Sequence, residues 1–87
     1  MERNNKFARI EEARRILELP ESAIMRQIKR NYRRLVKKWH PDLCKKDKKV
    51  CKKMFQKINN AYRELMAYCE DFQFSFSKKE VEKYISP

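Results

Sequence analysis

The chain has 87 residues, of which 40% are charged, and a formal net charge of +11 at pH 7. A chain this short forms one small domain, and without any glycine it cannot contain a Gly-rich phosphate-binding loop. The charge predicts an acidic partner, while the charged N-terminus and the lack of a long apolar run predict a cytoplasmic protein without a membrane span.

Helical periodicity dominates the N-terminal part of the chain. Ile10, Ala13 and Leu17 repeat at the spacing of one helix face, which predicts a first helix of about Lys6–Leu19. Pro20 is expected to end it, because proline lacks the N–H that a helix needs.

The second predicted helix, about Ser22–Trp39, is amphipathic and basic, with Ser22 as its expected N-cap. No acidic residue lies between Ala23 and Pro41, so the positive charges on this helix repel one another, which indicates a partner. We call these charged residues the basic face: Arg26, Lys29, Arg30, Arg33, Arg34, Lys37 and Lys38.

His40-Pro41-Asp42 directly follows this helix. Because proline cannot continue a helix and disfavours helical angles at the residue before it, the tripeptide is expected to begin a loop of about residues 41–47. Loops held between rigid helices often carry binding function. A third amphipathic helix is predicted at about Lys48–Tyr68, with Asp47 as its N-cap, and it should pack against the second helix as an antiparallel hairpin.

After Asp71 the pattern changes. Phe72, Phe74 and Phe76 alternate with polar residues, which is typical of an extended segment, and a single strand cannot pair alone. We therefore predict an extended arm packed on the helices. Ser77 and Glu80 match a capping box, which predicts a short last helix of about residues 78–85. The expected fold is all-α, with a core over residues 1–71 and the arm and last helix over residues 72–87, packed on the same domain.

The three cysteines, Cys44, Cys51 and Cys69, lack the spacing of a disulfide framework, so reduced thiols are expected. His40, Cys44 and Cys51 could be imagined as metal ligands, but their spacing does not match known zinc sites. With one histidine and no convergent pair of carboxylates, the chain is not expected to be an enzyme. No metal and no cofactor are predicted.

The order of these parts resembles the J-domain, the module of the DnaJ co-chaperones. The stretch IKRNYRRLVKKWHPD, residues 28–42, is similar to the second helix and signature loop of that family. FQKINNAYREL, residues 55–65, is similar to its third helix, and LELP, residues 17–20, to the end of its first. The resemblance covers about Glu12–Tyr68. The chain departs from the family pattern at Glu18, where glycine is usual, and at Leu43 and Cys44, where a basic residue and asparagine are common.

The resemblance implies that the chain binds a DnaK-type ATPase chaperone and stimulates its ATP hydrolysis as a co-chaperone. The implied docking residues are Lys29, Tyr32, Arg33, Arg34, Lys37 and Lys38, with His40, Pro41 and Asp42 as the trigger of hydrolysis. The chain is expected to act as a monomer.

Two alternatives stay open. The basic face could bind nucleic acid, either as the main function of a small helical domain or weakly and non-specifically beside the first function. Alternatively, a J-like fold could serve only as an assembly surface without stimulating an ATPase, and Glu18, Leu43 and Cys44 favour this reading. Considered alone, His40 could also be an ordinary residue at a helix C-terminus.

Overall fold

The computed structural model describes residues 5–85, and describes side chains as far as residue 83. Its helices are α1 (Lys6–Ile16), α2 (Met25–Trp39), α3 (Lys48–Glu70) and α4 (Lys78–Ile85). Since residues 5–85 contain no strand, the all-α prediction is confirmed. None of the helices in this range is apolar over a length that would cross a bilayer.

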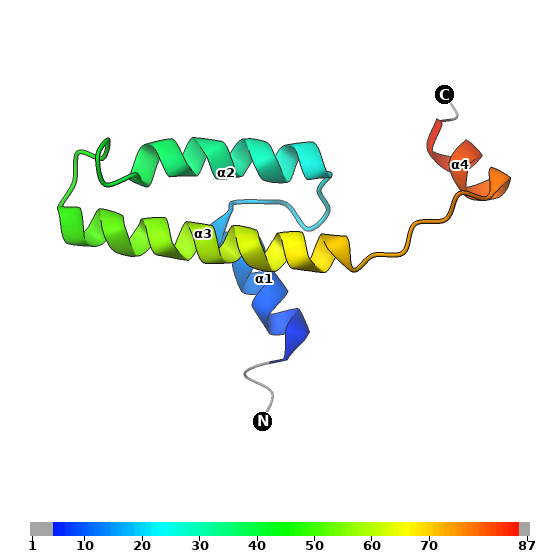
Figure 1. Cartoon of the computed structure of the whole chain (residues 1–87), viewed down its shortest axis with the longest axis horizontal. Helices are drawn as coiled ribbons and strands as arrows, with labels where there is room; N and C mark the ends of the chain where they lie inside the picture. The colour runs from blue at the N-terminus through cyan, green and yellow to red at the C-terminus, as the bar shows by residue number, and fades with distance from the viewer. Residues whose placement is uncertain (1–4, 86–87) are drawn as a thin grey trace.

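The helices α2 and α3 lie side by side and antiparallel, and α1 packs on α3 (Figure 1). The apolar core lies where these three helices meet. On α3 its members are Ile58, Ala61 and Leu65, spaced so that they share one helix face, as the sequence pattern predicts. Burying a leucine or isoleucine side chain contributes about 1.5–3 kcal/mol to stability. Burial of this face is therefore the main contribution to the stability of the hairpin. The other buried members are Ala13, Leu17, Leu19, Ile28 and Leu35.

The C-terminus of α1 lies earlier than predicted, because Pro20 does not end this helix. Glu18 takes a left-handed conformation with φ 55°, which breaks the helix after Ile16. The Leu19 N–H then donates to the Arg14 carbonyl at 3.0 Å, and the Glu18 N–H donates to the Arg15 carbonyl at 3.0 Å. These two bonds form a Schellman motif, in which glycine usually occupies the left-handed position.

Two side chains of α2 hold this helix end in place. The Asn31 amide donates to the carbonyls of Leu17 and Glu18, at 2.9 and 3.1 Å, and so satisfies acceptors that the end of α1 leaves open. The Arg34 guanidinium pairs with the Glu18 carboxylate at 2.9 Å. The C-terminus of α1 is therefore attached to the middle of α2 by polar contacts as well as by the core.

The predicted start of α2 was also wrong. The N-cap is Ile24, not Ser22, and the Ile24 N–H donates to the side chain of Gln27 at 2.8 Å. A glutamine at this position satisfies one of the free N–H groups of the first turn, so no serine cap is needed. Asp47 occupies the N-cap position of α3 as predicted, but its side chain makes no capping hydrogen bond.

The C-terminal arm does not pack as predicted. Phe74 and Phe76 are 72% and 85% exposed, and α4 packs on none of the other helices. Only Phe72 stays near the core, with its ring edge against Tyr68 at 5.1 Å between centroids. The reason is that α3 runs to Glu70, so the chain leaves the hairpin at its far end and extends away from it (Figure 1). The predicted cap is present, since Ser77 Oγ accepts from the Glu80 N–H at 3.3 Å.

The cysteines also differ from the prediction. Cys44 and Cys51 form a disulfide, with their Cα atoms 6.5 Å apart, so the expectation of reduced thiols is wrong for this pair. The loop after α2 reverses the chain direction and places Cys44 beside the start of α3, a proximity that their spacing in the sequence does not reveal. Cys69 is the one free cysteine in the described part of the chain.

The left-handed residue makes a testable prediction about stability. We expect Glu18→Gly to be about 0.5–1 kcal/mol more stable than Glu18→Ala, because glycine avoids the Cβ clash of this conformation at a partly offsetting entropic cost. Both variants lose the pair with Arg34, so the comparison isolates the backbone effect. Urea unfolding followed by circular dichroism measures the difference, and equal stabilities would contradict the strained-backbone interpretation.

Candidate functional site at the loop end of the hairpin

The His-Pro-Asp loop, residues 40–47, begins with a tight turn. His40 is the C-cap of α2 and has φ −59° and ψ 131°, the extended conformation that a following proline favours. Its N–H still donates to the Val36 carbonyl at 2.7 Å. Its own carbonyl accepts from the N–H groups of Leu43 and Cys44 at 2.9 and 2.8 Å. The chain therefore turns around the His40 carbonyl, with Pro41 and Asp42 at the tip.

The imidazole of His40 makes a hydrogen bond to the backbone at the tip of the turn. The Asp42 N–H donates to His40 Nδ1 at 3.1 Å, so Nδ1 is an acceptor and the proton of the neutral ring lies on Nε2. The Asp42 carboxylate is 4.0 Å from the same nitrogen, which is longer than a hydrogen bond. The hydrogen-bond partner of Nδ1 is therefore the backbone N–H of Asp42. The His40 ring also meets the Phe55 ring of α3 edge to face, at 5.1 Å between centroids. The side chain of Asp42 is 87% exposed, so its carboxylate faces solvent.

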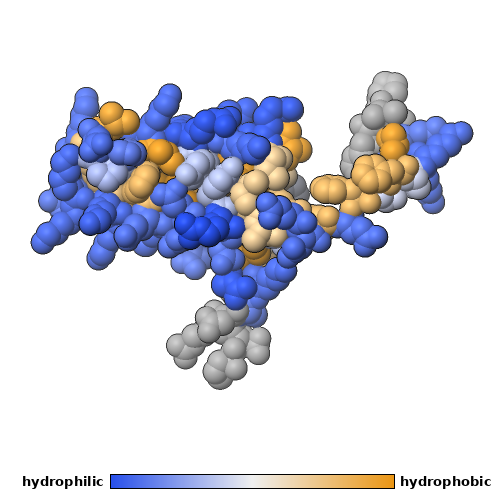
Figure 2. Space-filling model, viewed as in Figure 1, coloured by the Kyte–Doolittle hydropathy of each residue, from blue (hydrophilic) through white to orange (hydrophobic). Residues whose placement is uncertain are grey.

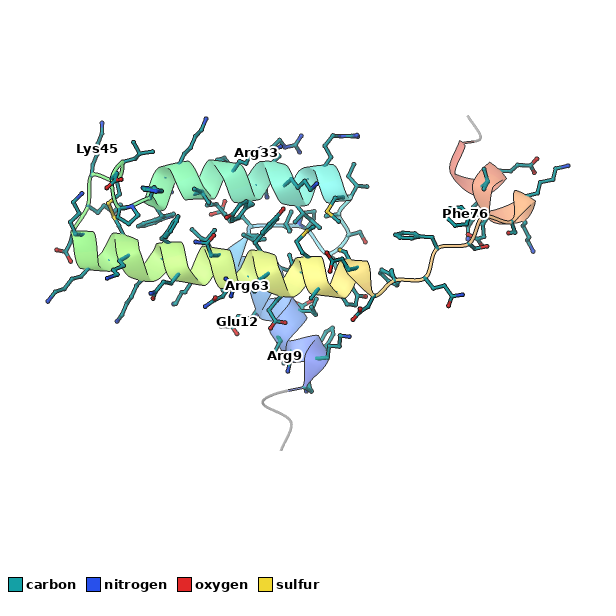
Figure 3. All side chains as sticks on the ribbon, viewed as in Figure 1. Arg9, Glu12, Arg33, Lys45, Arg63 and Phe76 are labelled. Carbon is teal, nitrogen blue, oxygen red and sulfur yellow. A yellow bond between two sulfur atoms is a disulfide. The ribbon has the colours of Figure 1, made fainter. Side chains whose placement is uncertain are left out.

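Further contacts attach the loop to both helices. Lys48, the first residue of α3, donates to the Pro41 carbonyl. The Trp39 ring lies near the ammonium groups of Lys38 and Lys46, at 5.6 and 5.8 Å from its centroid. The disulfide between Cys44 and Cys51 adds a covalent link to α3, drawn in yellow near Lys45 in Figure 3. Both ends of the tripeptide are thus fixed relative to the hairpin.

The basic face of α2 is exposed along its whole length. Every one of its seven members is solvent-exposed: Arg26, Lys29, Arg30, Arg33, Arg34, Lys37 and Lys38. Of the seven members of the basic face, Arg34 has an ion pair, with Glu18, and the other six have no ion pair with any described acidic residue. Figure 2 shows mostly hydrophilic residues over α2 and the loop end of the hairpin. Such a surface attracts acidic molecules and repels basic ones.

Tyr32 differs from the other implied docking residues, because it faces α3. It is half-buried, its ring stacks on Tyr62 at 4.0 Å between centroids, and its hydroxyl donates to Asn59 Oδ1 at 2.6 Å. The Asn59 amide in turn donates to the Phe55 carbonyl at 3.0 Å. Tyr32 therefore connects the two helices, and both its hydroxyl and one face of its ring make contacts within the domain.

The structure brings most of the implied residues to one end of the hairpin. A shallow hollow there is lined by Lys37 and Lys38 of α2 together with Leu43, Cys44, Lys45 and Lys46 of the loop. The tripeptide and the C-terminal half of the basic face therefore form one continuous surface. Lys29 and Arg33 lie farther along the same helix, and Arg34 is directed to Glu18.

Sequence reasoning missed several residues that position this site. Asn31 and Asn59 connect helices, Phe55 supports His40, and Lys48 holds the Pro41 carbonyl. The two asparagines carried a usable signal, since asparagine is unfavourable inside a helix unless its side chain has a structural role. Phe55 and Lys48 carried none, because one looks like an ordinary core residue and the other like an ordinary surface charge.

Comparison with known proteins indicates which family the chain is similar to. The family model for the DnaJ domain matches residues 15–68. Chaperone protein DnaJ 2 of Aquifex aeolicus is 50% identical over 50 residues, which are 58% of this chain and 13% of that protein. Chaperone protein DnaJ of Thermotoga maritima is 44% identical over 50 residues, covering 58% of this chain and 14% of the relative. The DnaJ-like protein MG002 homolog of Mycoplasma pneumoniae is 47% identical over 47 residues, covering 54% and 14%. No solved structure gives a significant match.

The contact between Tyr32 and Asn59 can be tested by stability. We expect Tyr32→Phe to lower the free energy of unfolding by about 1–2 kcal/mol, because it leaves the half-buried Asn59 oxygen without its donor. Tyr62→Phe is the matched control, since the structure gives the Tyr62 hydroxyl no hydrogen bond among the described residues. Equal losses for both variants in thermal unfolding would contradict the structural role of this contact.

Proposed function

The chain belongs to the DnaJ-domain family, and on this premise we propose that it is a co-chaperone that docks on a DnaK-type ATPase chaperone and stimulates its ATP hydrolysis. The observation that carries the proposal is an exposed carboxylate, Asp42, on a loop fixed to both helices beside an unpaired basic face. The proposed docking residues are Lys29, Tyr32, Arg33, Arg34, Lys37 and Lys38, with His40, Pro41 and Asp42 as the trigger. The matched segment is only 13–14% of the relatives' length, so activities of those whole proteins are not carried over.

The basic face serves to find and orient the partner. Its six unpaired charges attract an acidic surface over about a Debye length, which raises the rate of encounter and selects the orientation of docking. Arg34 contributes less, because part of its charge is already matched by Glu18. The affinity of docking is therefore expected to fall as salt rises.

The loop serves to change the state of the partner. Asp42 offers a charged hydrogen-bond acceptor. Its N–H donates to the His40 ring, and the next two residues, Leu43 and Cys44, donate to the His40 carbonyl. A ligand shifts a conformational equilibrium only by its difference in affinity for the two states. We propose that Asp42 finds its donor only in the hydrolysis-competent state of the ATPase, so that docking favours that state. In this proposal the domain acts as a regulator, and the catalytic groups belong to the partner. The proposed location of both proteins is the cytoplasm.

The trigger role of Asp42 has a direct test. In single-turnover ATP hydrolysis by a DnaK-type chaperone, Asp42→Asn is expected to lower stimulation by about tenfold or more, since removing one partner of a buried charged hydrogen bond costs about 2 kcal/mol or more. Asp47→Asn is the matched control, because Asp47 is exposed in the same loop and its side chain makes no capping bond.

Normal stimulation by Asp42→Asn, with the helical content unchanged, would contradict the trigger role. If the unmodified domain is folded and does not stimulate, the fold is better explained as an assembly surface without effect on the ATPase.

A second candidate function, binding of nucleic acid, rests on charge outside the basic face. No acidic residue lies between Lys48 and Arg63, and the lysines at the start of α3 and in the loop are exposed: Lys45, Lys46, Lys48, Lys49, Lys52, Lys53 and Lys57. Lysines that neutralise phosphates release counterions, so affinity then falls steeply with salt.

A salt series with a DNA duplex tests whether the domain neutralises phosphates when it binds. If about five phosphates are neutralised, the logarithm of the binding constant should fall with the logarithm of salt at a slope of about −4 to −5. Replacing Lys49, Lys53 and Lys57 by glutamine should reduce the magnitude of that slope, with stimulation of the ATPase retained. A slope near zero would exclude phosphate binding.

A further inference from the structure

We infer that Cys44 and Cys51 form a reversible thiol–disulfide site that sets how firmly the His-Pro-Asp loop is held, with glutathione-class thiols and disulfides as its reactants. The expected effect on an ATPase partner rests on the proposed function. The exchange chemistry and the effect on the loop do not.

The disulfide lies on a short path from α3 to the tripeptide. Cys51, in the first turns of α3, is completely buried, and its sulfur is bonded to Cys44 in the loop. The N–H of Cys44 donates to the His40 carbonyl at 2.8 Å, and this carbonyl is the centre of the turn that carries Pro41 and Asp42. One covalent bond and one hydrogen bond therefore connect the position of α3 to the conformation of the tip.

Few other contacts hold this end of the hairpin. Cys51 is buried but lies outside the apolar cluster that joins α1, α2 and α3. Around it the chain is lysine-rich, and Leu43 is 61% exposed. The loop is therefore held mainly by the His40–Phe55 ring contact, the bond from Lys48 to Pro41, and the disulfide. A segment with so few buried apolar contacts opens locally at low cost once one of these links is removed.

The exchange reaction needs only oxidised glutathione. The Cys44 thiolate attacks one sulfur of oxidised glutathione and releases one glutathione thiolate, which leaves a mixed disulfide. The Cys51 thiolate then attacks Cys44 Sγ and releases the second glutathione thiolate. The two protons lost by the cysteines are taken up by the two glutathione thiolates. The two cysteines are thus oxidised and one glutathione disulfide is reduced, and excess reduced glutathione reverses both steps.

The surroundings favour exchange at this pair over the third cysteine. Cys44 is only half-buried, so a small thiol reaches its sulfur and Cys51 leaves as the thiolate. Lys45 and Lys46 line the same hollow as Cys44, and nearby positive charge favours a thiolate over a thiol. Burial instead raises the pKa of the Cys69 thiol, which lies near the other end of α3. In the cytosol, disulfides are usually transient or redox-sensing, which agrees with a reversible role.

The oxidised form is the one that presents the trigger firmly. In the reduced form the Cys44 side chain is free, so the turn around His40 samples more conformations and the docking-competent fraction falls. The apparent dissociation constant rises in inverse proportion to the docking-competent fraction. Reduction should therefore raise the concentration of domain needed for half-maximal stimulation, by about threefold or more, and leave stimulation at saturation nearly unchanged.

The test compares the full chain in two redox states. The protein is equilibrated in glutathione buffers of defined ratio, and intact mass after alkylation reports how much disulfide is present. Glutathione is then removed, and two readouts are taken on each state. They are hydrogen exchange of the Leu43 and Cys44 amides, and the concentration dependence of ATPase stimulation. Oxidation is expected to protect these amides and to lower the half-maximal concentration.

Variants assign the effect to the pair. Cys44→Ser should behave as the reduced protein in every buffer, whereas Cys69→Ser, the matched control, should keep the full response. Failure of the pair to oxidise in a glutathione-disulfide buffer would overturn the inference, as would equal amide exchange or equal half-maximal concentrations in the two states of a stimulating domain. If neither state stimulates but the amides still differ, the proposed function fails and redox control of the loop stands.

Discussion

The contact between α2 and α3 is the constraint on which the rest of the structure depends. Ile28 and Leu35 of α2 are buried against the stripe of Ile58, Ala61 and Leu65 on α3. Because a helix that buries one face must expose the other, this contact also decides that the charges of α2 point to solvent. The Tyr32–Asn59 hydrogen bond adds a polar contact between the same two helices. The position of the basic face is therefore a consequence of the core.

The same contact fixes both ends of the His-Pro-Asp loop. Once the helices lie antiparallel, the loop must reverse the chain within residues 40–47. Proline ends α2, the His40 carbonyl closes the turn, and Phe55, Lys48 and Cys51 attach the turn to α3. These few contacts hold Asp42 in a defined place. Because they bury little apolar surface, we expect the loop to be sensitive to the loss of one of them, the Cys44–Cys51 disulfide.

The sequence was sufficient to predict the helices and the loop, because both depend on local patterns. Apolar spacing placed α3, and Pro41 placed the end of α2 at Trp39. The predictions failed where the outcome depends on contacts distant in the chain or on a single backbone angle. The left-handed Glu18, the partner of Cys44 and the direction of the arm after Glu70 are of this kind. Within the site, the tripeptide and the exposed charges were predictable, and the apolar spacing of the second helix already favours a core or boundary position for Tyr32. Its hydrogen bond to Asn59, which is distant in the chain, was not predictable.

We propose that the basic face and the His-Pro-Asp loop together form the surface that binds a DnaK-type ATPase. The most direct test is an NMR titration of isotope-labelled domain with the ATP-bound chaperone. We expect the signals of Lys29, Arg33, Lys37 and Asp42 to shift or broaden first, and those of Phe74 and Phe76 in the exposed arm to stay unchanged. Changes confined to the arm or to the lysines of α3, or no changes at all, would contradict the claim.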